Sequence, residues 1–162
     1  MTKDYRPNAG IMLINADGRV FMAQRSDNRD PAWQMPQGGI DENEDPLTAA
    51  KRELFEETNV SSVKLIAEST HWYTYDFPSD VSFFSKKKKK YKGQRQKWFL
   101  FLFTGDESEI DLQAHDKEFS DWTWMEAQSV PEHIVSFKRG VYDAVVSEFM
   151  PFIEAVAAQK AG

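Results

Sequence analysis

Residues 38–60 read GGIDENEDPLTAAKRELFEETNV, and this stretch decides the fold. Asp45 followed by Pro46 is a strong helix start, because Asp caps the first backbone N–H groups and Pro fits the first helical position. The pattern therefore predicts a helix over residues 46–58. Advancing about 100° per residue gives this helix one apolar face, formed by Leu47, Ala50 and Leu54 with Phe55 at its side.

Three glutamates, Glu53, Glu56 and Glu57, gather in the last turns of the predicted helix. Their i,i+3 and i,i+4 spacing makes them repel one another, and the negative end of the helix dipole disfavours them further. Local conflicts of this kind often mark functional sites. Three carboxylates form an all-oxygen site suited to Mg²⁺ or Mn²⁺. The alternative is a solvated acidic face, with Lys51 and Arg52 as counter-charges.

Composition limits the class of protein. The chain has 162 residues, of which 41% are hydrophobic and 14% aromatic, so it has the material for one folded domain and is not a disordered chain. Its longest apolar run has six residues, Trp98–Phe103, whereas a membrane helix needs about 20. No secretory leader is recognisable, and there is no cysteine for disulfides or thiolate metal sites. We therefore expect a cytoplasmic protein without a membrane span.

The net charge of −6 hides an asymmetry along the chain. Residues 86–97 contain eight bases and no acid, whereas residues 41–57 contain seven acids and two bases. The first segment should attract anions and the second cations. A polyphosphate carrying magnesium would satisfy both segments, and ordinary solvated surface charge is the alternative.

Outside the central helix, strands predominate. Residues 8–14 and 19–25 form a predicted hairpin around Asp17-Gly18. Further strands are expected within 63–77, 96–104 and 121–125, with loops at 26–31 and 78–92 and a short helical stretch opening at Pro131. Apolar residues at helical spacing predict an amphipathic C-terminal helix over about 139–158, kinked or split at Pro151. The order of elements favours an α+β fold or a three-layer mixed sheet.

Residues 38–60 also carry a family resemblance. Gly38, Glu44, Arg52, Glu53, Glu56 and Glu57 stand at the spacing of the Nudix box, G-x5-E-x7-R-E-U-x-E-E-x-G-U, where U is aliphatic. The chain closely resembles the Nudix hydrolases over most of its length. One position departs: Asn59 replaces the glycine after the helix, and Asn is the non-glycine residue that best tolerates the left-handed conformation expected there.

The resemblance implies a fold and a function. The fold would be a single Nudix domain over residues 1–162, an α/β/α sandwich with a mixed sheet, a Nudix box at 38–60 and a basic loop at 86–97. Residues 5–8, 33–40, 93–99 and 135–139 resemble the bacterial RNA pyrophosphohydrolases, and residues 72–78 resemble the diadenosine tetraphosphate hydrolases. The implied reaction is water attack on a P–O–P bond. The first hypothesis is pyrophosphate removal from triphosphorylated RNA 5′ ends, and the second is hydrolysis of dinucleoside polyphosphates. A catalytically silent nucleotide- or RNA-binding module is the third, and the oligomeric state stays open.

The same resemblance implies roles for individual residues. Mg²⁺, or Mn²⁺ in its place, would be held by Glu53, Glu56, Glu57, Glu118 and Gly38. Arg52 would orient the glutamates and Glu44 would brace the loop, while the general base is open among Glu53, Glu56 and Glu118. The 5′ polyphosphate would be clamped by basic side chains, namely Arg6, Arg25, Arg95, Lys97 and Lys138. A terminal base would stack on Tyr75, Val135 and Phe137, with core packing as the alternative for Tyr75 and Val135.

Overall fold

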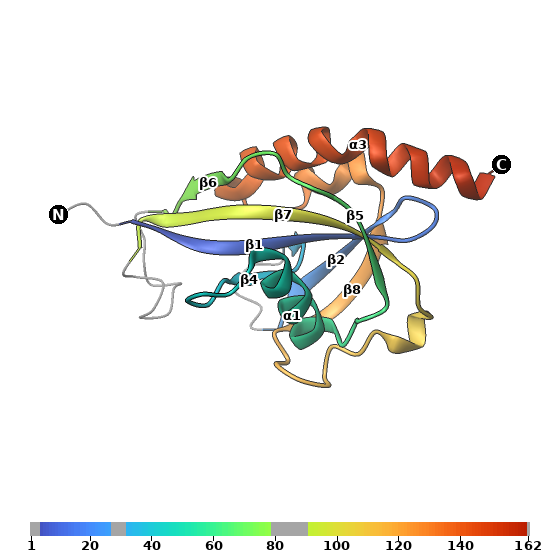
Figure 1. Ribbon diagram of the computed structural model, residues 1–162, viewed down its shortest axis with the longest axis horizontal. Helices are drawn as coiled ribbons and strands as arrows, with labels where there is room; N and C mark the ends of the chain where they lie inside the picture. The colour runs from blue at the N-terminus through green and yellow to red at the C-terminus, as the bar shows by residue number, and fades with distance from the viewer. Residues whose placement is uncertain (1–3, 27–31, 79–90, 162) are drawn as a thin grey trace.

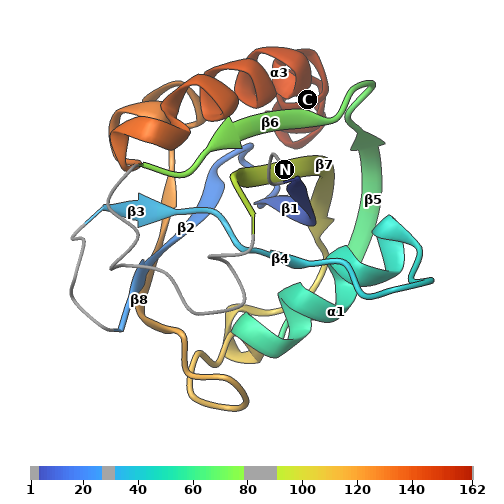
Figure 2. The same ribbon diagram turned by 90° about the vertical axis from the view of Figure 1, so that its left-hand side faces the viewer.

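The computed structural model describes residues 4–26, 32–78 and 91–161, in which eight strands form one mixed sheet. The helix α1 (Pro46–Thr58) covers one face of the sheet, and the helix α3 (Arg139–Ala161) covers the other. Figures 1 and 2 show these three layers, with the long strands β1 and β7 between the helices. The three-layer arrangement and the mixed sheet agree with the sequence-based prediction.

The strand β1 (Tyr5–Ile14) is the centre of the sheet. It pairs in parallel with β7 (Gly93–Phe103) along its whole length, and antiparallel with β2 (Val20–Arg25) and β4 (Gln37–Gly39) at its other edge. Further antiparallel pairs extend both sides of the sheet. They are β2 with β3 (Trp33–Gln34) and β8 (Phe119–Met125), and β7 with β5 (Val63–Glu68) and β6 (Tyr73–Asp76).

Two apolar cores lie on opposite faces of the sheet. In β1, Ile11 and Leu13 point to the α1 side, whereas Met12 and Ile14 point to the α3 side, as strand alternation requires. All four side chains are fully buried. The sheet is therefore held between two packed layers, and every polar residue of β1 and β7 is assigned to one face by its position in the strand.

The bounds of α1 match the prediction from sequence. The Oδ2 atom of Asp45 accepts from the N–H groups of Leu47 at 3.1 Å and Thr48 at 3.2 Å, and Pro46 occupies the first helical position. Asn59 ends the helix in the left-handed conformation, with φ of 67°. The predicted faces differ in two places: Phe55 is 40% exposed, whereas Glu57 is buried.

Several other bounds differ from the prediction. The strand β7 begins at Gly93, so residues 93–97 of the predicted basic loop lie in the sheet; residues 79–90, which include the lysine run 86–90 of that loop, are outside the described residues. The predicted strand region 63–77 contains two strands separated by residues 69–72. The short helical stretch is a 3₁₀ helix, Ala127–Glu132, with Pro131 inside it.

The C-terminal helix continues through Pro151 to Ala161, so the predicted split is wrong. Proline removes one backbone hydrogen bond of the helix. The buried residues Phe149 and Ile153, one on each side of Pro151, anchor both halves of α3 to the same core. No helix in the described part of the chain combines the length and apolarity needed to cross a membrane.

The capping contact of Asp45 gives a test of this fold. Asp45→Ala removes both hydrogen bonds to the first turn of α1, so we expect the free energy of unfolding to fall by about 1 kcal/mol. Urea denaturation would measure the difference. Glu42→Ala, an exposed change in the same acidic loop, is the control and should stay within about 0.5 kcal/mol of the parent. Equal losses in both variants would contradict the capping role.

Candidate active site

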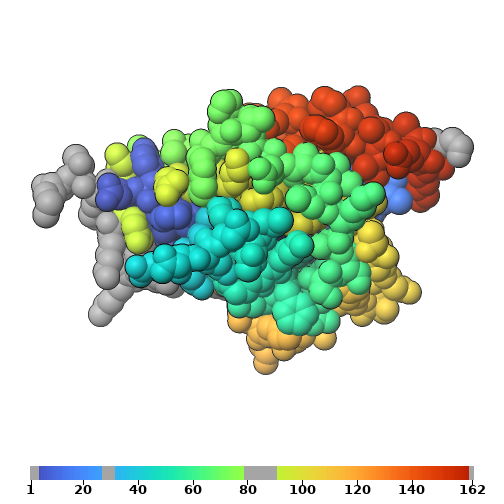
Figure 3. All heavy atoms as spheres, viewed as in Figure 1, coloured from blue at the N-terminus to red at the C-terminus, as the bar shows by residue number. Residues whose placement is uncertain are grey.

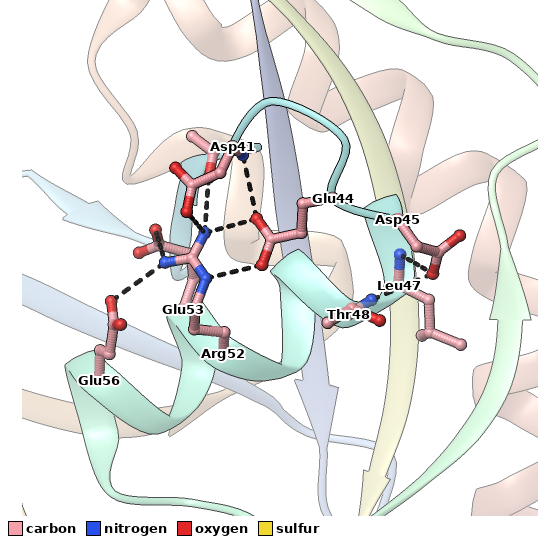
Figure 4. A network of polar contacts seen from close by, with 9 residues as sticks. Asp41, Glu44, Asp45, Leu47, Thr48, Arg52, Glu53 and Glu56 are labelled. Atoms are coloured by element: carbon pink, nitrogen blue, oxygen red, sulfur yellow. Dashed lines mark hydrogen bonds and ion pairs between the residues drawn. The ribbon is translucent and has the colours of Figure 1, made fainter.

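Arg52 is the centre of a carboxylate network on α1 (Figure 4). Its guanidinium forms a bidentate pair with Glu44, with Nε–Oε2 at 2.8 Å and Nη2–Oε1 at 2.9 Å. Nη1 donates to Glu53 Oε1 at 2.8 Å and to Glu56 Oε2 at 3.3 Å, and Nη2 also donates to the Gly39 carbonyl. These partners raise the pKa of Arg52, chiefly through the hydrogen bonds that it donates to Glu44. One cation thereby orients the acidic loop and two of the predicted metal ligands.

Two glutamates of this region are held in an environment that disfavours their charge. Glu57 is 2% exposed, and burial, reinforced by Glu118 and Glu53, raises its pKa well above the ordinary value. Its carboxylate accepts the backbone N–H of Gln37, but Oε2 has no hydrogen-bond partner among the residues that the structure describes. Burial likewise raises the pKa of Glu53 to about 7, against the opposing effect of Arg52. A divalent cation would favour the charged form of both groups.

Gly38 and Gly39 are in strand β4, and each must be glycine because the side chain of another residue packs directly against its Cα atom. A Cβ atom at Gly38 would overlap the carboxylate of Glu53, and a Cβ atom at Gly39 would overlap the guanidinium of Arg6. The two glycines point to opposite faces of the sheet, so Glu53 and Arg6 lie on either side of β4.

Glu118 is brought to the α1 region by the segment that precedes β8. Its carbonyl accepts the backbone N–H of Ser26 at 2.8 Å, and the register of β2 and β8 shifts beside it, at Gln24/Arg25. The Glu118 charge acts on both Glu53 and Glu57. The distal glutamate suggested by sequence is therefore electrostatically coupled to the Nudix-box glutamates.

Asn59, the departure from the box, has a structural role that its position in the motif did not reveal. Its Nδ2 donates to the Glu109 carbonyl at 3.0 Å, and its Oδ1 contacts His115 Nε2 at 3.0 Å. The ring of His115 packs against Phe55 with centroids 4.6 Å apart. Asn59 therefore connects the end of α1 to the segment that leads to Glu118.

The glutamates of this region have the chemistry to bind a divalent cation, although their side chains do not converge on a single point. Within residues 4–26, 32–78 and 91–161, no three carboxylate or imidazole side chains converge on one point. Arg52 draws Glu53 and Glu56 to one side, and Glu57 lies on the buried side of the helix. The fit rests on the unpartnered Oε2 of Glu57, the oxygen-only donor set and the close approach of the Glu53 carboxylate to Gly38.

Four of the predicted substrate-binding residues lie together on the α3 side. Tyr75 and Phe137 have ring centroids 5.7 Å apart, and Lys138 Nζ lies 5.7 Å from the Tyr75 centroid. The charge of Arg6 lowers the pKa of Tyr75, against a larger opposite effect of burial. Tyr75 is only 7% exposed and belongs to the core, as does its neighbour Gln94. Tyr75 therefore exposes little of its ring, although it lines the same open groove as Phe137, which is only partly buried.

The remaining predicted residues lie elsewhere. Arg95 and Lys97 alternate with buried Gln94 and Gln96 in β7, so they point to the α1 face, away from Lys138. Arg25 ends β2 opposite Phe119, beside Glu118. The partly buried Val135 packs against the α3-side core. The structure thus divides the predicted polyphosphate clamp between the two faces of the sheet.

Sequence reasoning missed a set of buried amides near β4. Gln96 Nε2 donates to Asn8 Oδ1 at 2.9 Å and to Gln37 Oε1 at 3.0 Å, while Tyr75 Oη donates to Gln94 Oε1 at 2.9 Å. Within the described part of the chain, Asn8 Nδ2 and Gln94 Nε2 have no hydrogen-bond partner. The sequence signal was present: Gln94 and Gln96 stand two apart in a strand, which places both on one face.

The end of α1 holds clustered, partly buried carboxylates, with one arginine that orients them and further basic residues nearby. This arrangement is suited to metal-assisted chemistry on a phosphorylated substrate. A family comparison agrees: the NUDIX domain model matches residues 4–145. The chain belongs to this family, and the recognition made from residues 38–60 is confirmed. Nudix hydrolases use divalent metal ions in general.

Relatives and solved structures are consistent with this assignment. The chain is 49% identical over 150 residues to an RNA pyrophosphohydrolase of Caulobacter vibrioides, covering 91% of this chain and 87% of that protein. It is 50% identical over 156 residues to an RNA pyrophosphohydrolase of Afipia carboxidovorans, covering 91% and 93%. The fold resembles the E. coli dihydroneopterin triphosphate pyrophosphohydrolase with a TM-score of 0.66 at 22% identity, covering 90% and 99%. The α/β/α Nudix sandwich predicted from the sequence is thereby confirmed.

The raised pKa of Glu53 makes the stability of the metal-free protein depend on pH. The folded chain binds the Glu53 proton more tightly than the unfolded chain, since the pKa rises from 4.5 to about 7. The resulting stabilisation is complete at low pH and is lost as the pH rises through about 7. We expect the melting temperature to fall between about pH 5 and pH 8, and to fall less in Glu53→Gln. Scanning calorimetry in a chelator would measure both, and parallel curves would refute the assignment.

Proposed function

We propose that this Nudix hydrolase removes pyrophosphate from the 5′ end of triphosphorylated RNA. The observation that carries the proposal is the cluster around Arg52, in which the family's glutamates are present and coupled to one another. The names of relatives at about half identity over nine-tenths of the chain support RNA as the substrate. We place the activity in the cytoplasm, where such RNA ends are made.

The glutamates and Gly38 would hold the metal. Glu53, Glu56, Glu57 and Glu118 supply the carboxylates, with Mg²⁺ as the expected ion and Mn²⁺ as a substitute. When bound, the metal would neutralise charge on the phosphoryl group and lower the pKa of a bound water. Arg52 keeps Glu53 and Glu56 oriented, and Glu44 fixes Arg52. The general base stays open among Glu53, Glu56 and Glu118, because a metal bound to these carboxylates would lower the raised pKa of Glu53.

The substrate would lie across the β4 end of the sheet. Arg6 lies against Gly39, on the opposite side of β4 from the Gly38–Glu53 contact, and would hold phosphate oxygens where the substrate passes the β4 edge of the sheet. Arg25 and Lys97 supply positive charge on the α1 face, and Lys138 on the α3 face. An open groove of about 610 Å³ follows β6 and the start of α3, and Phe137 lines it. We assign the terminal base to Phe137, with Val135 beside it in sequence.

Dinucleoside polyphosphate hydrolysis is the second candidate, because residues 72–78 resemble the diadenosine tetraphosphate hydrolases. Both substrates present a base followed by a polyphosphate, so the same site accommodates either. A silent binding module is less favoured, since binding alone does not require an unpartnered buried glutamate that weakens the fold.

A product assay separates the candidates. With Mg²⁺ and equal concentrations of 5′-triphosphorylated RNA and diadenosine tetraphosphate, we expect turnover of the RNA with release of pyrophosphate or of successive phosphates. Chromatography of the products would identify them. Preferential formation of adenosine triphosphate and monophosphate would instead establish the second candidate, and no product from either substrate would leave only the binding module.

Glu57→Gln tests the metal assignment. The substitution removes a buried charge while keeping the shape, so we expect turnover to fall by at least about 10²-fold. The same change should raise the melting temperature of the metal-free protein, because it removes the cost of burying the carboxylate. It should also abolish the rise in melting temperature that millimolar Mg²⁺ or Mn²⁺ gives the parent.

Glu126→Gln is the matched control, since Glu126 is exposed and precedes the 3₁₀ helix without capping it through its side chain. It should leave turnover and the metal-induced shift unchanged. Near-parental activity of Glu57→Gln would show that the metal site has been assigned to the wrong side chains.

A further inference from the structure

Cations on the α1 face of β7 and beside it include two that stack on aromatic rings. Arg95 lies over the ring of Trp72 at 4.5 Å, and Lys92 lies over the ring of Tyr5 at 4.5 Å. Trp72 is 38% exposed, and Arg95 and Lys92 are exposed. We call Trp72, Arg95, Tyr5 and Lys92 the stacked edge. In Figure 3, yellow-green atoms from the start of β7 reach the surface between the green and teal segments.

The stacked edge is connected to the reaction centre by the register of the sheet. Lys97 pairs with Ala9, and Ala9 pairs with Gly38, so the three residues share one face. Two strand spacings, about 10 Å, separate the Lys97 and Gly38 backbones. Arg95 is two residues further along the same face. A row of positive charge therefore leads from the glutamate cluster along β7 toward the β6 edge.

The stacked edge also meets the groove assigned to the terminal base. Thr74 lines that groove and lies opposite Arg95 in the β6–β7 pair. A chain whose first base occupies the groove therefore reaches Arg95 and Trp72 by crossing β6 at Thr74. One carboxylate, Asp76, shares this strand region, and its Oδ1 accepts from Tyr5 Oη at 2.5 Å.

We propose that the stacked edge binds nucleotides of single-stranded RNA beyond the first two. The proposal rests on the proposed function and names where the RNA continues. Exposed aromatic rings next to arginine and lysine are what unpaired bases and their phosphates bind without sequence preference. The protein carries a net charge of −6, so few of its surfaces favour a polyanion. The stacked edge does, because it brings the basic side chains of Arg95 and Lys92 close to the active site.

The test compares two 5′-triphosphorylated substrates, a dinucleotide and a dodecamer. For Trp72→Ala we expect kcat/KM on the dodecamer to fall about 5- to 30-fold, since one lost stacking contact has this magnitude. The loss should lie in KM, with kcat unchanged, because the contact is equally strong in ground and transition states. Both parameters on the dinucleotide should match the parent, and Trp72→Phe should restore most of the loss.

Leu65→Ala is the matched control, because Leu65 is also a 38% exposed apolar residue but is aliphatic and lies in β5, outside the stacked edge. This variant should leave kcat/KM unchanged for both the dinucleotide and the dodecamer. For Arg95→Gln, dodecamer binding should depend less on salt, with the log–log slope smaller by about 0.7 if one phosphate contact is lost.

Three outcomes would overturn the proposal. They are an unchanged dodecamer KM in Trp72→Ala, equal losses on dinucleotide and dodecamer, and a selective loss on diadenosine tetraphosphate, which would make the stacked edge a subsite for a second nucleoside. Failure of the proposed function gives a different result, in which the parent protein releases no phosphate from either RNA.

Discussion

The site depends on one electrostatic constraint: a single guanidinium is shared by several carboxylates at the tail of α1. Arg52 bonds to Glu44, Glu53 and Glu56 at once, so their negative charge exceeds its positive charge. Glu57 adds a further carboxylate that Arg52 does not reach, and burial makes its charge costly. This imbalance leaves the carboxylates short of positive charge, which a bound divalent cation would supply.

The sequence predicted the helix and its acidic face well because both are local properties. Asp45, Pro46 and Asn59 define the ends of α1 by short-range capping chemistry. The burial of Glu57 is different. A helical projection places Glu57 at the border of the apolar face. In the structure, β4 lies next to Glu57 and donates the Gln37 N–H to its carboxylate. No local pattern specifies which strand will lie over a helix, so the depth of a border residue follows only from the tertiary structure.

The substrate residues show the same limit in the sheet. Arg6, Arg95, Lys97 and Lys138 look alike in a sequence search for phosphate-binding cations. Because β7 begins at Gly93 and continues through Lys97, strand alternation sends Arg95 and Lys97 to the face opposite the Gln94 and Gln96 amides. Predicting residues 78–92 as a loop and the strand from 96 obscured that alternation. Tyr75 likewise has the right chemistry for stacking, but its ring completes the α3-side core.

Clustered like charges and an unpartnered buried carboxylate lower stability, and the surrounding fold must offset that cost. Apolar cores on both faces of the sheet supply the compensation, and the long parallel pairing of β1 with β7 joins them. This pairing sets Ala9 beside Lys97, and the pairing of β1 with β4 sets Gly38 beside Ala9 on the same face. The strand β7 therefore stabilises the fold around the acidic site and also bears Lys97 and Arg95 beside that site. These two cations give a net acidic protein a local surface that attracts a polyanion.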